Sequence, residues 1–396
     1  MPNVPIVLLL LLAIAILLRV DFVFYLVYVL AGTYMLANWW TGRSLGWLRM
    51  NRRFTDHAFL GEKVGVEIEV ENSSWWPVPW LRCQEAPPPA IAASSRIHQV
   101  VALRPKERLR LRYDLLGAQR GYYELGPTIL GAGDLFGFAE SQGRYDQPDH
   151  LTVYPRVIPL ASVALASRSP HGTVKSQQPI FADPARVKGV REYQPGDPLA
   201  AVNWKSSARA GRLMVKRYEP AVSLTTVIAL EMHTPSYTRQ VQLQASEWGI
   251  VVAASLANYL MGQRQAVGLI CNGTDPLTGA DRWTIPPRGG RPHLMKLLEW
   301  LARVQLVETT ALADWLPTAC LNLAWGTTVI AVTPTGDEAT CRALHRLLRA
   351  GLNPVLAVVE PHGQFGVVRE RARRLGIAAY LAADERELQQ WGATIR

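Results

Sequence analysis

The sequence opens with two apolar runs, VPIVLLLLLAIAILL at residues 4–18 and FVFYLVYVLAGTYMLANWW at residues 22–40. Arg19 and Asp21 separate these runs. A membrane-spanning helix needs about 20 apolar residues, with a range of about 17–25. The second run meets this length, whereas the first has to thin the bilayer or extend Arg19 to its surface. We therefore expect a transmembrane hairpin of two antiparallel helices.

The residues that follow the second run set its orientation. Trp39 and Trp40 stand where interfacial aromatic residues belong. Four arginines come before the first acidic residue of this flank, and they are Arg43, Arg49, Arg52 and Arg53. Basic flanks stay in the cytoplasm, so we expect both termini there. A cleaved signal peptide is disfavoured because residues 1–3 are not basic, whereas a re-entrant hairpin stays an alternative.

The next region alternates apolar and polar residues with a period of two. Residues 64–71 alternate Val or Ile with Gly or Glu, and residues 108–115 alternate Arg or Asp with Leu or Tyr. Such alternation predicts strands with one buried and one wet face. Turn residues punctuate the stretch, which has no helical period. We expect a hairpin and basic juxtamembrane segment at residues 1–53 and a β-sandwich-like domain at residues 54–157.

The C-terminal region alternates strand and helix patterns instead. Apolar runs at residues 224–230, 327–332 and 354–359 predict buried strands, and residues 245–260 have the period of an amphipathic helix. Further expected elements are a strand at 265–271 and helices at 293–304, 338–349, 369–375 and 385–391. This order predicts a mostly parallel sheet covered on both faces, an α/β, Rossmann-like domain at residues 221–396.

A distinctive segment lies in the linker expected at residues 158–220. It reads GVREYQPGD at 189–197, NWKSSAR at 203–209 and LMVKRYE at 213–219. It resembles the bacterial family called domain of unknown function 58, at Arg191, Tyr193, Gly196, Asp197, Trp204, Lys205, Arg209, Leu213 and Val215. The family usually has a basic residue about three positions after its Gly-Asp, where this chain has Leu199, Ala200 and Ala201.

The resemblance implies a transmembrane hairpin, a β-rich domain and a C-terminal fold similar to von Willebrand factor type A. It implies no established enzymatic activity. Members are often encoded beside MoxR-type AAA+ ATPases and transglutaminase-like membrane proteins. The resemblance therefore implies a scaffold or adaptor for such an ATPase or an envelope complex. Its place would be the bacterial inner membrane, with the large C-terminal portion in the cytoplasm.

Two interpretations of the signature segment stay open. In the first it is a binding surface, with Tyr193 and Trp204 as anchors and Arg191 or Arg209 as carboxylate clamps. In the second, which we favour, Asp197 pairs with an arginine in a tight turn and Trp204 packs a domain joint. The full set of candidate interaction residues is Arg191, Tyr193, Gly196, Asp197, Asn203, Trp204, Lys205 and Arg209.

Two further functions compete with these interpretations. A hydrolase or transferase would use Arg191, Asp197, Trp204 and Arg209 as its pocket. A nucleic-acid site needs basic and aromatic side chains together, which the segment offers, but a membrane anchor disfavours it.

A metal site is the remaining question for a type A-like domain. Such domains often hold Mg²⁺ at an Asp-x-Ser-x-Ser loop after the first strand. Here that loop carries Glu231, His233 and Ser236, and Asp337 is a later carboxylate. Because Mg²⁺ demands strict octahedral geometry, these replacements predict a degenerate, metal-free site. A metal-dependent adhesion module that faces outward is the competing hypothesis.

Composition excludes several classes of protein. With 49% hydrophobic and 19% charged residues in 396, the chain is not disordered, and four cysteines are too few for a disulfide scaffold. The net charge of +10 indicates an anionic partner, either nucleic acid or a phospholipid surface. No Gly-x-x-x-x-Gly-Lys loop and no Cys-x-x-Cys pair occurs, so we expect no cofactor and favour a non-enzymatic protein.

Overall fold

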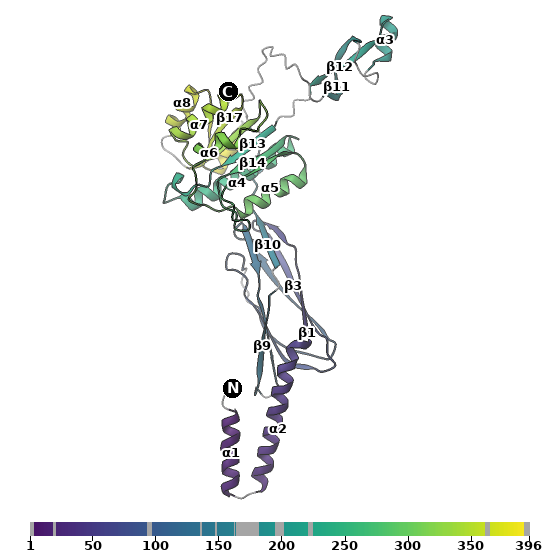
Figure 1. The fold of residues 1–396 in the computed structure, drawn as a ribbon, viewed down its shortest axis with the longest axis vertical. Helices are drawn as coiled ribbons and strands as arrows, with labels where there is room; N and C mark the ends of the chain where they lie inside the picture. The colour runs from purple at the N-terminus through teal and green to yellow at the C-terminus, as the bar shows by residue number, and fades with distance from the viewer. Residues whose placement is uncertain are drawn as a thin grey trace. The chain divides into compact units, whose positions relative to one another are not determined.

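The computed structural model divides the chain into two units (Figure 1). The first comprises Met1–Val157 with Leu298–Val304, and the second comprises Ile158–Leu297 with Gln305–Arg396. The residues that the structure describes are 4–18, 21–92, 97–134, 137–146, 149–161, 163, 182–194, 202–220, 225–360 and 365–391.

The first unit begins with two apolar helices, α1 (Val4–Leu18) and α2 (Asp21–Ser44), which pack side by side (Figure 1). One helical stretch, Asp21–Trp47, is long and apolar enough to cross a membrane by its length and composition. Its apolar side chains are mostly exposed, as Phe22, Val29 and Met35 illustrate. A shorter apolar helix precedes it at Val4–Leu17.

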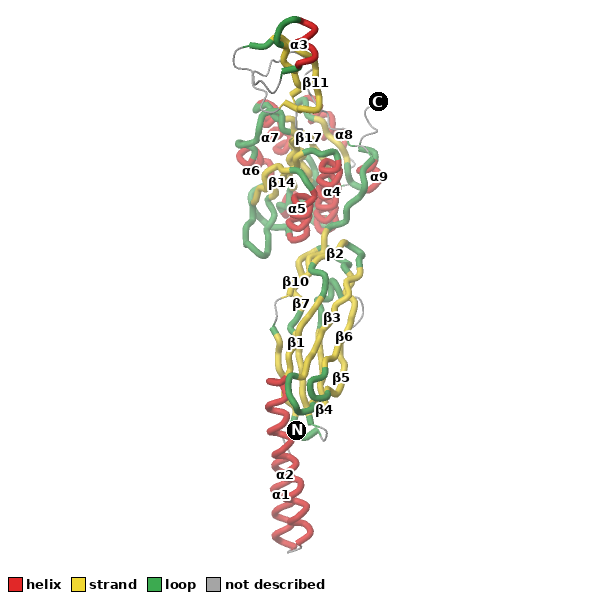
Figure 2. The backbone as a smooth tube through the Cα atoms, turned by 90° about the vertical axis from the view of Figure 1, so that its right-hand side faces the viewer, coloured by secondary structure: helices red, strands yellow, loops and turns green. Residues whose placement is uncertain are grey.

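A sheet-rich domain, called the β domain here, follows the short 3-10 helix Leu45–Trp47. Its strands are β1 (Leu48–Arg53), β2 (His57–Phe59), β3 (Lys63–Asn72), β4 (Val78–Glu85), β5 (Ile97–Leu103), β6 (Arg108–Leu116), β7 (Gly121–Leu125), β8 (Thr128–Gly133), β9 (Glu140–Tyr145) and β10 (Asp149–Tyr154). They form sheets ordered β1-β3-β6, β2-β10-β7 and β5-β4-β8-β9. Figure 2 shows β1, β3 and β6 side by side. The apolar faces of these sheets meet in one core.

The expected alternation is visible in β3, where Val64, Val66, Ile68 and Val70 are buried on one face. Strand β1 pairs with β3 throughout its length, from Leu48 opposite Asn72 onward. The sheet therefore already includes residues that precede the boundary expected at residue 54.

The orientation argument requires one correction, at Arg52. This residue is not an exposed flanking charge but lies on the inward face of β1, where its side chain is fully buried. Its guanidinium group donates to Glu85 Oε1 at 2.8 Å, to Asp149 Oδ2 at 2.6 Å and to Thr128 Oγ1 at 2.9 Å. The basic flank of α2 thus keeps only its other three arginines.

The second unit contains a mixed six-stranded sheet in the order β15-β14-β13-β16-β17-β18. Its strands are β13 (Thr225–Leu230), β14 (Ala266–Cys271), β15 (Trp283–Arg288), β16 (Thr328–Thr333), β17 (Asn353–Val358) and β18 (Ala378–Leu381). All neighbours are parallel except β15, which is antiparallel to β14. The expected mostly parallel α/β sheet is confirmed.

Helices cover both faces of this sheet. They are α4 (Gln242–Gly262), α5 (Arg291–Arg303), α6 (Leu312–Ala319), α7 (Glu338–Arg349), α8 (Phe365–Arg374) and α9 (Glu385–Gln389). Leu316 of α6 and Leu344 of α7 share a core with Val227 of β13. On the opposite face of β13, Leu230 contacts α4 at Gly249.

Candidate functional site

The signature segment folds as a small unit of its own, not as a plain linker. Strand β11 (Ala182–Glu192) pairs antiparallel with β12 (Met214–Pro220), and the helix α3 (Trp204–Ala210) lies between them in sequence. Asn203 caps α3 by accepting from the Ser206 amide at 3.3 Å. Gly211, at φ +67°, ends the helix in the left-handed conformation that glycine adopts without strain.

Hydrogen bonds to Met214 fix α3 and its N-cap against β12. The Ser207 hydroxyl donates to the Asn203 carbonyl at 2.9 Å and accepts from the Met214 amide at 2.8 Å. The Asn203 amide also donates to the Met214 carbonyl at 2.8 Å. Val202 and Val215 are buried beneath these contacts. We call residues 182–194 and 202–220 the signature unit. The polar side chains of Asn203 and Ser207 thus form hydrogen bonds inside this unit.

The outer side of α3 is different. Trp204 is 68% exposed, and Lys205 and Arg209, one and five positions further along the helix, are also exposed. Because Lys205 and Arg209 are four residues apart, they share one face of the helix. Among the described residues, neither side chain forms a hydrogen bond or an ion pair. The interpretation that Trp204 packs a joint therefore gains no support, since its indole is not covered.

The other predicted signature residues are distributed unevenly. Arg191 is half-buried and donates to the Glu192 carbonyl at 3.1 Å, while Tyr193 is half-buried and its amide donates to the Leu213 carbonyl. Gly196 and Asp197 lie outside the described residues, and so does the ion pair expected of Asp197. Trp204 and Arg209, two members of the expected enzymatic pocket, stand exposed instead of enclosed.

A second polar cluster lies at the carboxyl ends of the central strands of the six-stranded sheet. We call this part of the second unit (225–360 and 365–391) the α/β domain. The strand order reverses between β13 and β16, which is where open α/β sheets usually bind ligands. Glu231 directly follows β13 and is only 3% exposed. Its Oε1 accepts from the Ser236 hydroxyl at 2.8 Å and from the Leu312 amide at 3.1 Å. Burial raises the pKa of the Glu231 carboxyl.

Polar side chains at the ends of the neighbouring strands also have hydrogen-bond partners within the protein. Glu360, after β17, accepts from the Thr238 amide at 2.8 Å and from its hydroxyl at 2.9 Å. Asn272, after β14, accepts from the Met232 amide at 2.7 Å and donates to the Thr310 carbonyl at 3.0 Å. These side chains tie the loops of this edge together through Glu231 Oε1, both carboxylate oxygens of Glu360 and the amide of Asn272.

The residues predicted for a degenerate metal loop each have hydrogen-bond partners of their own. Ser236 hydrogen-bonds Glu231, His233 accepts from the Thr309 amide at 3.3 Å, and Asp337 caps α7 by accepting from the Thr340 amide at 2.8 Å. Burial lowers the pKa of His233. Within the described ranges, no group of three or more His, Cys, Asp or Glu side chains is placed to hold a metal ion.

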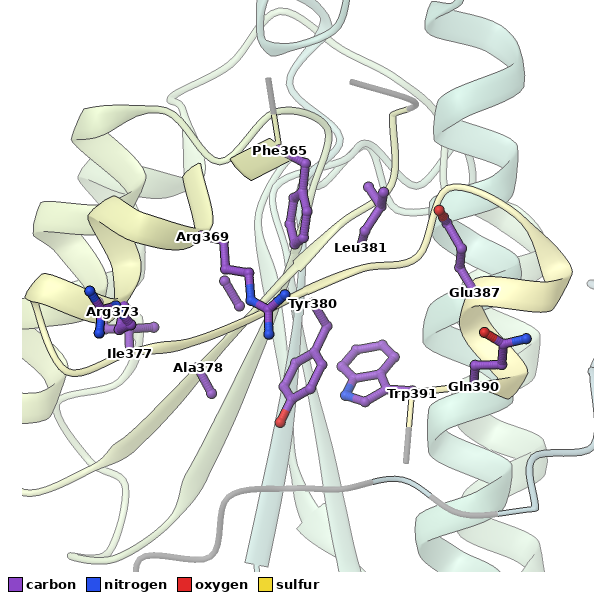
Figure 3. A pocket seen from close by; sticks show the side chains of 11 residues that line it. Phe365, Arg369, Arg373, Ile377, Ala378, Tyr380, Leu381, Glu387, Gln390 and Trp391 are labelled. Atoms are coloured by element: carbon purple, nitrogen blue, oxygen red, sulfur yellow. The ribbon is translucent and has the colours of Figure 1, made fainter. Parts of the chain in front are cut away.

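The sequence did not predict one further feature, a pocket of about 350 Å³ at the edge strand β18. Figure 3 shows the Phe365, Tyr380 and Trp391 rings around it with the guanidinium group of Arg369. These side chains come from α8, β18 and the residues after α9. No periodic pattern brings them together, and the pocket is lined by none of the signature residues.

The class of protein is now defined by the order of its parts along the chain: an apolar N-terminal helix, a sheet-rich domain, the signature unit and an α/β domain. The family described as "Protein of unknown function DUF58" matches residues 189–323, which include most of the signature unit and the first part of the α/β domain. The resemblance predicted from the signature is thereby confirmed.

One curated relative is the "Uncharacterized protein YeaD" of Bacillus subtilis (strain 168). It is 25% identical over 247 residues, which cover 61% of this chain and 58% of that protein. The chain therefore matches less than two thirds of this relative's length.

Several solved structures match about a quarter of the chain. The CARDB domain of the PF1109 protein from Pyrococcus furiosus matches with a TM-score of 0.20 and 17% identity, over 27% of this chain and 86% of that one. A beta-glucosidase from Listeria innocua matches with a TM-score of 0.17 and 12% identity, over 27% and 16%. Spo0M, a sporulation control protein from Bacillus subtilis, matches with a TM-score of 0.16 and 12% identity, over 27% and 49%. Scores this low support no conclusion about fold or activity.

Proposed function

We propose that this protein is a membrane-anchored scaffold that binds another protein through the exposed side of its signature unit. The observation that carries the proposal is the contrast within α3. Ser207 hydrogen-bonds within the signature unit, whereas Trp204 is 68% exposed and the same short helix carries the exposed Lys205 and Arg209. Tryptophan and arginine dominate the binding energy of protein interfaces, and guanidinium groups pair with carboxylates. The partner surface that fits is acidic and offers an apolar pocket for the indole.

The N-terminal helices supply the anchor in this proposal. A core helix of a soluble protein buries its apolar residues, whereas α2 exposes Phe22, Val29 and Met35. The exposed Arg43, Arg49 and Arg53 still form a basic flank. By the positive-inside rule, this flank favours the bacterial inner membrane with the large C-terminal portion in the cytoplasm.

The α/β domain is, in this proposal, similar to von Willebrand factor type A and acts without a metal. Its strand order and its antiparallel edge strand β15 support this assignment. The carboxyl ends of its strands are closed by internal hydrogen bonds, such as those of Glu231 and Glu360. This arrangement favours a protein-binding role over metal chemistry.

The partner that we propose is a MoxR-type AAA+ ATPase or an envelope complex with a transglutaminase-like membrane protein. The family resemblance suggests both, and a basic, tryptophan-bearing surface suits an acidic patch on either. The partner and the anchor are separate parts of the proposal and have separate tests.

The partner is tested by photo-crosslinking the full-length protein in native membranes, with the crosslinking side chain placed at the exposed Leu213. We expect crosslinks to the ATPase, and we expect Trp204→Ala to lower their yield by tenfold or more, since a central tryptophan contributes about 2 kcal/mol or more. Trp325→Ala is the matched control, because Trp325 is 73% exposed but lies outside the signature unit. Equal yields from the two variants would contradict the proposal.

The anchor is tested by fractionating cells and washing the membranes at alkaline pH. We expect the full-length protein to stay with the lipid, and a protease added to intact cells to leave its C-terminus uncut. Release by the wash, or cleavage in intact cells, would exclude the proposed anchoring or its orientation.

A further inference from the structure

We propose that the β domain has a second membrane contact, the loop of residues 73–77 between β3 and β4, which we call the tryptophan loop. In this proposal Trp75 and Trp76 lie in the headgroup layer of an anionic phospholipid bilayer. The inference rests on the proposed membrane anchor and adds a site to it. It rests on three observations: the exposure of the two tryptophans, the position of the loop along α2, and the cations near the tryptophan rings.

Exposure is the first observation. Trp75 is 81% exposed and Trp76 is 52% exposed, although large aromatic side chains are usually buried in part. Tryptophan is enriched at membrane interfaces, where its ring is half apolar and its N–H meets the headgroups. Two adjacent exposed tryptophans in one short loop therefore match this layer.

The loop is fastened to the end of the membrane helix. Trp40 of α2 donates from its Nε1 to the Pro77 carbonyl at 3.2 Å, and its ring lies 5.1 Å from the Trp76 ring. The Ser73 amide donates to the Trp47 carbonyl at 2.8 Å. The loop consequently sits at the same depth along α2 as Trp40.

That depth is the membrane surface. Trp40 follows Asp21 by roughly 28 Å of helix at about 1.5 Å per residue, which is close to the roughly 30 Å hydrocarbon core. The Phe138 ring lies 6.5 Å from the Tyr34 ring of α2. Tyr34 is about 9 Å closer to Asp21 along the helix than Trp40, so in this proposal the loop that carries Phe138 reaches below the headgroup layer. Between α2 and the β domain lies a mostly apolar pocket of about 230 Å³, lined by Thr33, Leu36, Ala37, Trp40, Pro77, Pro79 and Asp134. Such a pocket suits an acyl chain.

Charge identifies the lipid. The Lys106 ammonium lies 5.2 Å from the centre of the Trp75 ring, and the Arg43 guanidinium lies 5.0 Å from that of Trp39. Lys106 is held there by its neighbours, since its amide donates to the Ser74 carbonyl at 3.3 Å and its Nζ donates to the Ser73 carbonyl. Cations beside interfacial rings attract anionic headgroups.

The test places one fluorescent probe at each of three positions in the full-length protein. The variants are Trp75→Cys in the loop, Val29→Cys in the proposed span and Leu60→Cys beyond the other end of β3. A ten-residue strand separates the first and last positions by roughly 33 Å. The four native cysteines are buried, and burial raises the pKa of Cys83 and Cys320 to about 12, so their labelling is slow.

Each labelled protein is reconstituted in vesicles of phosphatidylcholine and phosphatidylglycerol in equal parts, with a nitroxide just below the headgroups. We expect the Trp75→Cys probe to lose roughly half its emission, because interfacial groups lie about 5–10 Å into the boundary. The Leu60→Cys probe should keep its emission. Quenching at Val29 without quenching at position 75 would overturn the second contact while the anchor stands. An unquenched Val29→Cys probe would instead overturn the anchor, and this inference with it.

The preference for anionic lipid has its own measurement. In vesicles of pure phosphatidylcholine, the quenching at position 75 should fall. Lys106→Asn should lower it in the mixed vesicles to the same level, since asparagine tolerates the left-handed backbone of residue 106, at φ +61°. Quenching that is independent of both the lipid and this substitution would overturn the assignment to anionic headgroups.

Discussion

The β domain and the α/β domain both bury carboxylates, but they neutralise them differently. In the β domain, the fully buried Arg52 donates to Glu85, whose side chain is 1% exposed, and to the partly exposed Asp149. In the α/β domain, Glu231 has only neutral donors, a serine hydroxyl and a backbone amide. In the first site the charges of buried ion partners balance one another. In the second site a carboxyl group accepts hydrogen bonds from neutral donors only, and burial raises its pKa.

The largest effect is expected from Arg52→Met. The substitution leaves Glu85 buried without its cation, and removing one partner of a buried pair costs about 3–5 kcal/mol. Denaturant unfolding of the solubilised full-length protein, followed by hydrogen exchange in each unit, should show this loss in the β domain alone.

The matched control is the double variant Arg52→Met with Glu85→Leu. Replacing a buried pair by apolar residues is often neutral, and Asp149 keeps access to water. The double variant should therefore be more stable than the single variant. If both lose the same stability, Arg52 acts through packing and the charge comparison between the two domains is wrong.

Substitution of Glu231 is expected to have a smaller effect that depends on pH. Glu231→Ala leaves the Leu312 amide and the Ser236 hydroxyl without an acceptor, which costs about 1–3 kcal/mol. Glu231→Gln keeps an acceptor for both donors and removes the titration. Because burial raises the folded-state pKa, the carboxyl group favours folding most below its unfolded pKa of about 4.3. This contribution is lost as the pH rises through the folded pKa.

The free energy of unfolding of the α/β domain, measured against pH, checks this assignment. The wild-type curve should fall relative to that of Glu231→Gln as the pH rises from about 4. Parallel curves would show that Glu231 titrates alike in the folded and unfolded chains, and the contrast with the β domain would then disappear.

Sequence patterns predict many of the helices and strands of both domains. They miss the features that depend on residues far apart in the sequence. Leu48, Met50 and Arg52 share the inward face of β1. A sequence pattern predicts a solvent-exposed side chain for an arginine at this position. Its partners Glu85 and Asp149 stand 33 and 97 residues away, so no local pattern could pair them with it. The expected helices and parallel strands were found because each buries its own periodic apolar face.

Two elements that the sequence patterns did not predict, β15 and α6, contain prolines, which usually interrupt strands and helices. Strand β15 contains Pro286 and Pro287, which are tolerated because β15 is an edge strand. Helix α6 contains Pro317. In the signature unit, the density of charged and aromatic residues indicated a special segment. The exposure of Trp204 depends on which side of α3 meets β12, and a seven-residue helix has too little periodicity to decide this.

The smallest effect is expected at Asp337, which the sequence offered as a metal-binding carboxylate and the structure places as the exposed N-cap of α7. Asp337→Ala should cost about 1 kcal/mol, because the Thr340 amide loses its acceptor. Asp337→Asn should cost much less, since asparagine caps as well as aspartate. The free energy of unfolding of the α/β domain measures both substitutions.

Mg²⁺ separates the cap from a metal ligand. A ligand that binds only the folded state raises stability with its concentration. If Asp337 acts only as a cap, millimolar Mg²⁺ should leave the wild-type melting temperature unchanged, and the ranking of the two variants should not depend on the metal. A rise with Mg²⁺ that Asp337→Asn abolishes would show that Asp337 binds a cation. The carboxylates of the α/β domain would then be neutralised by charge, as those of the β domain are by Arg52.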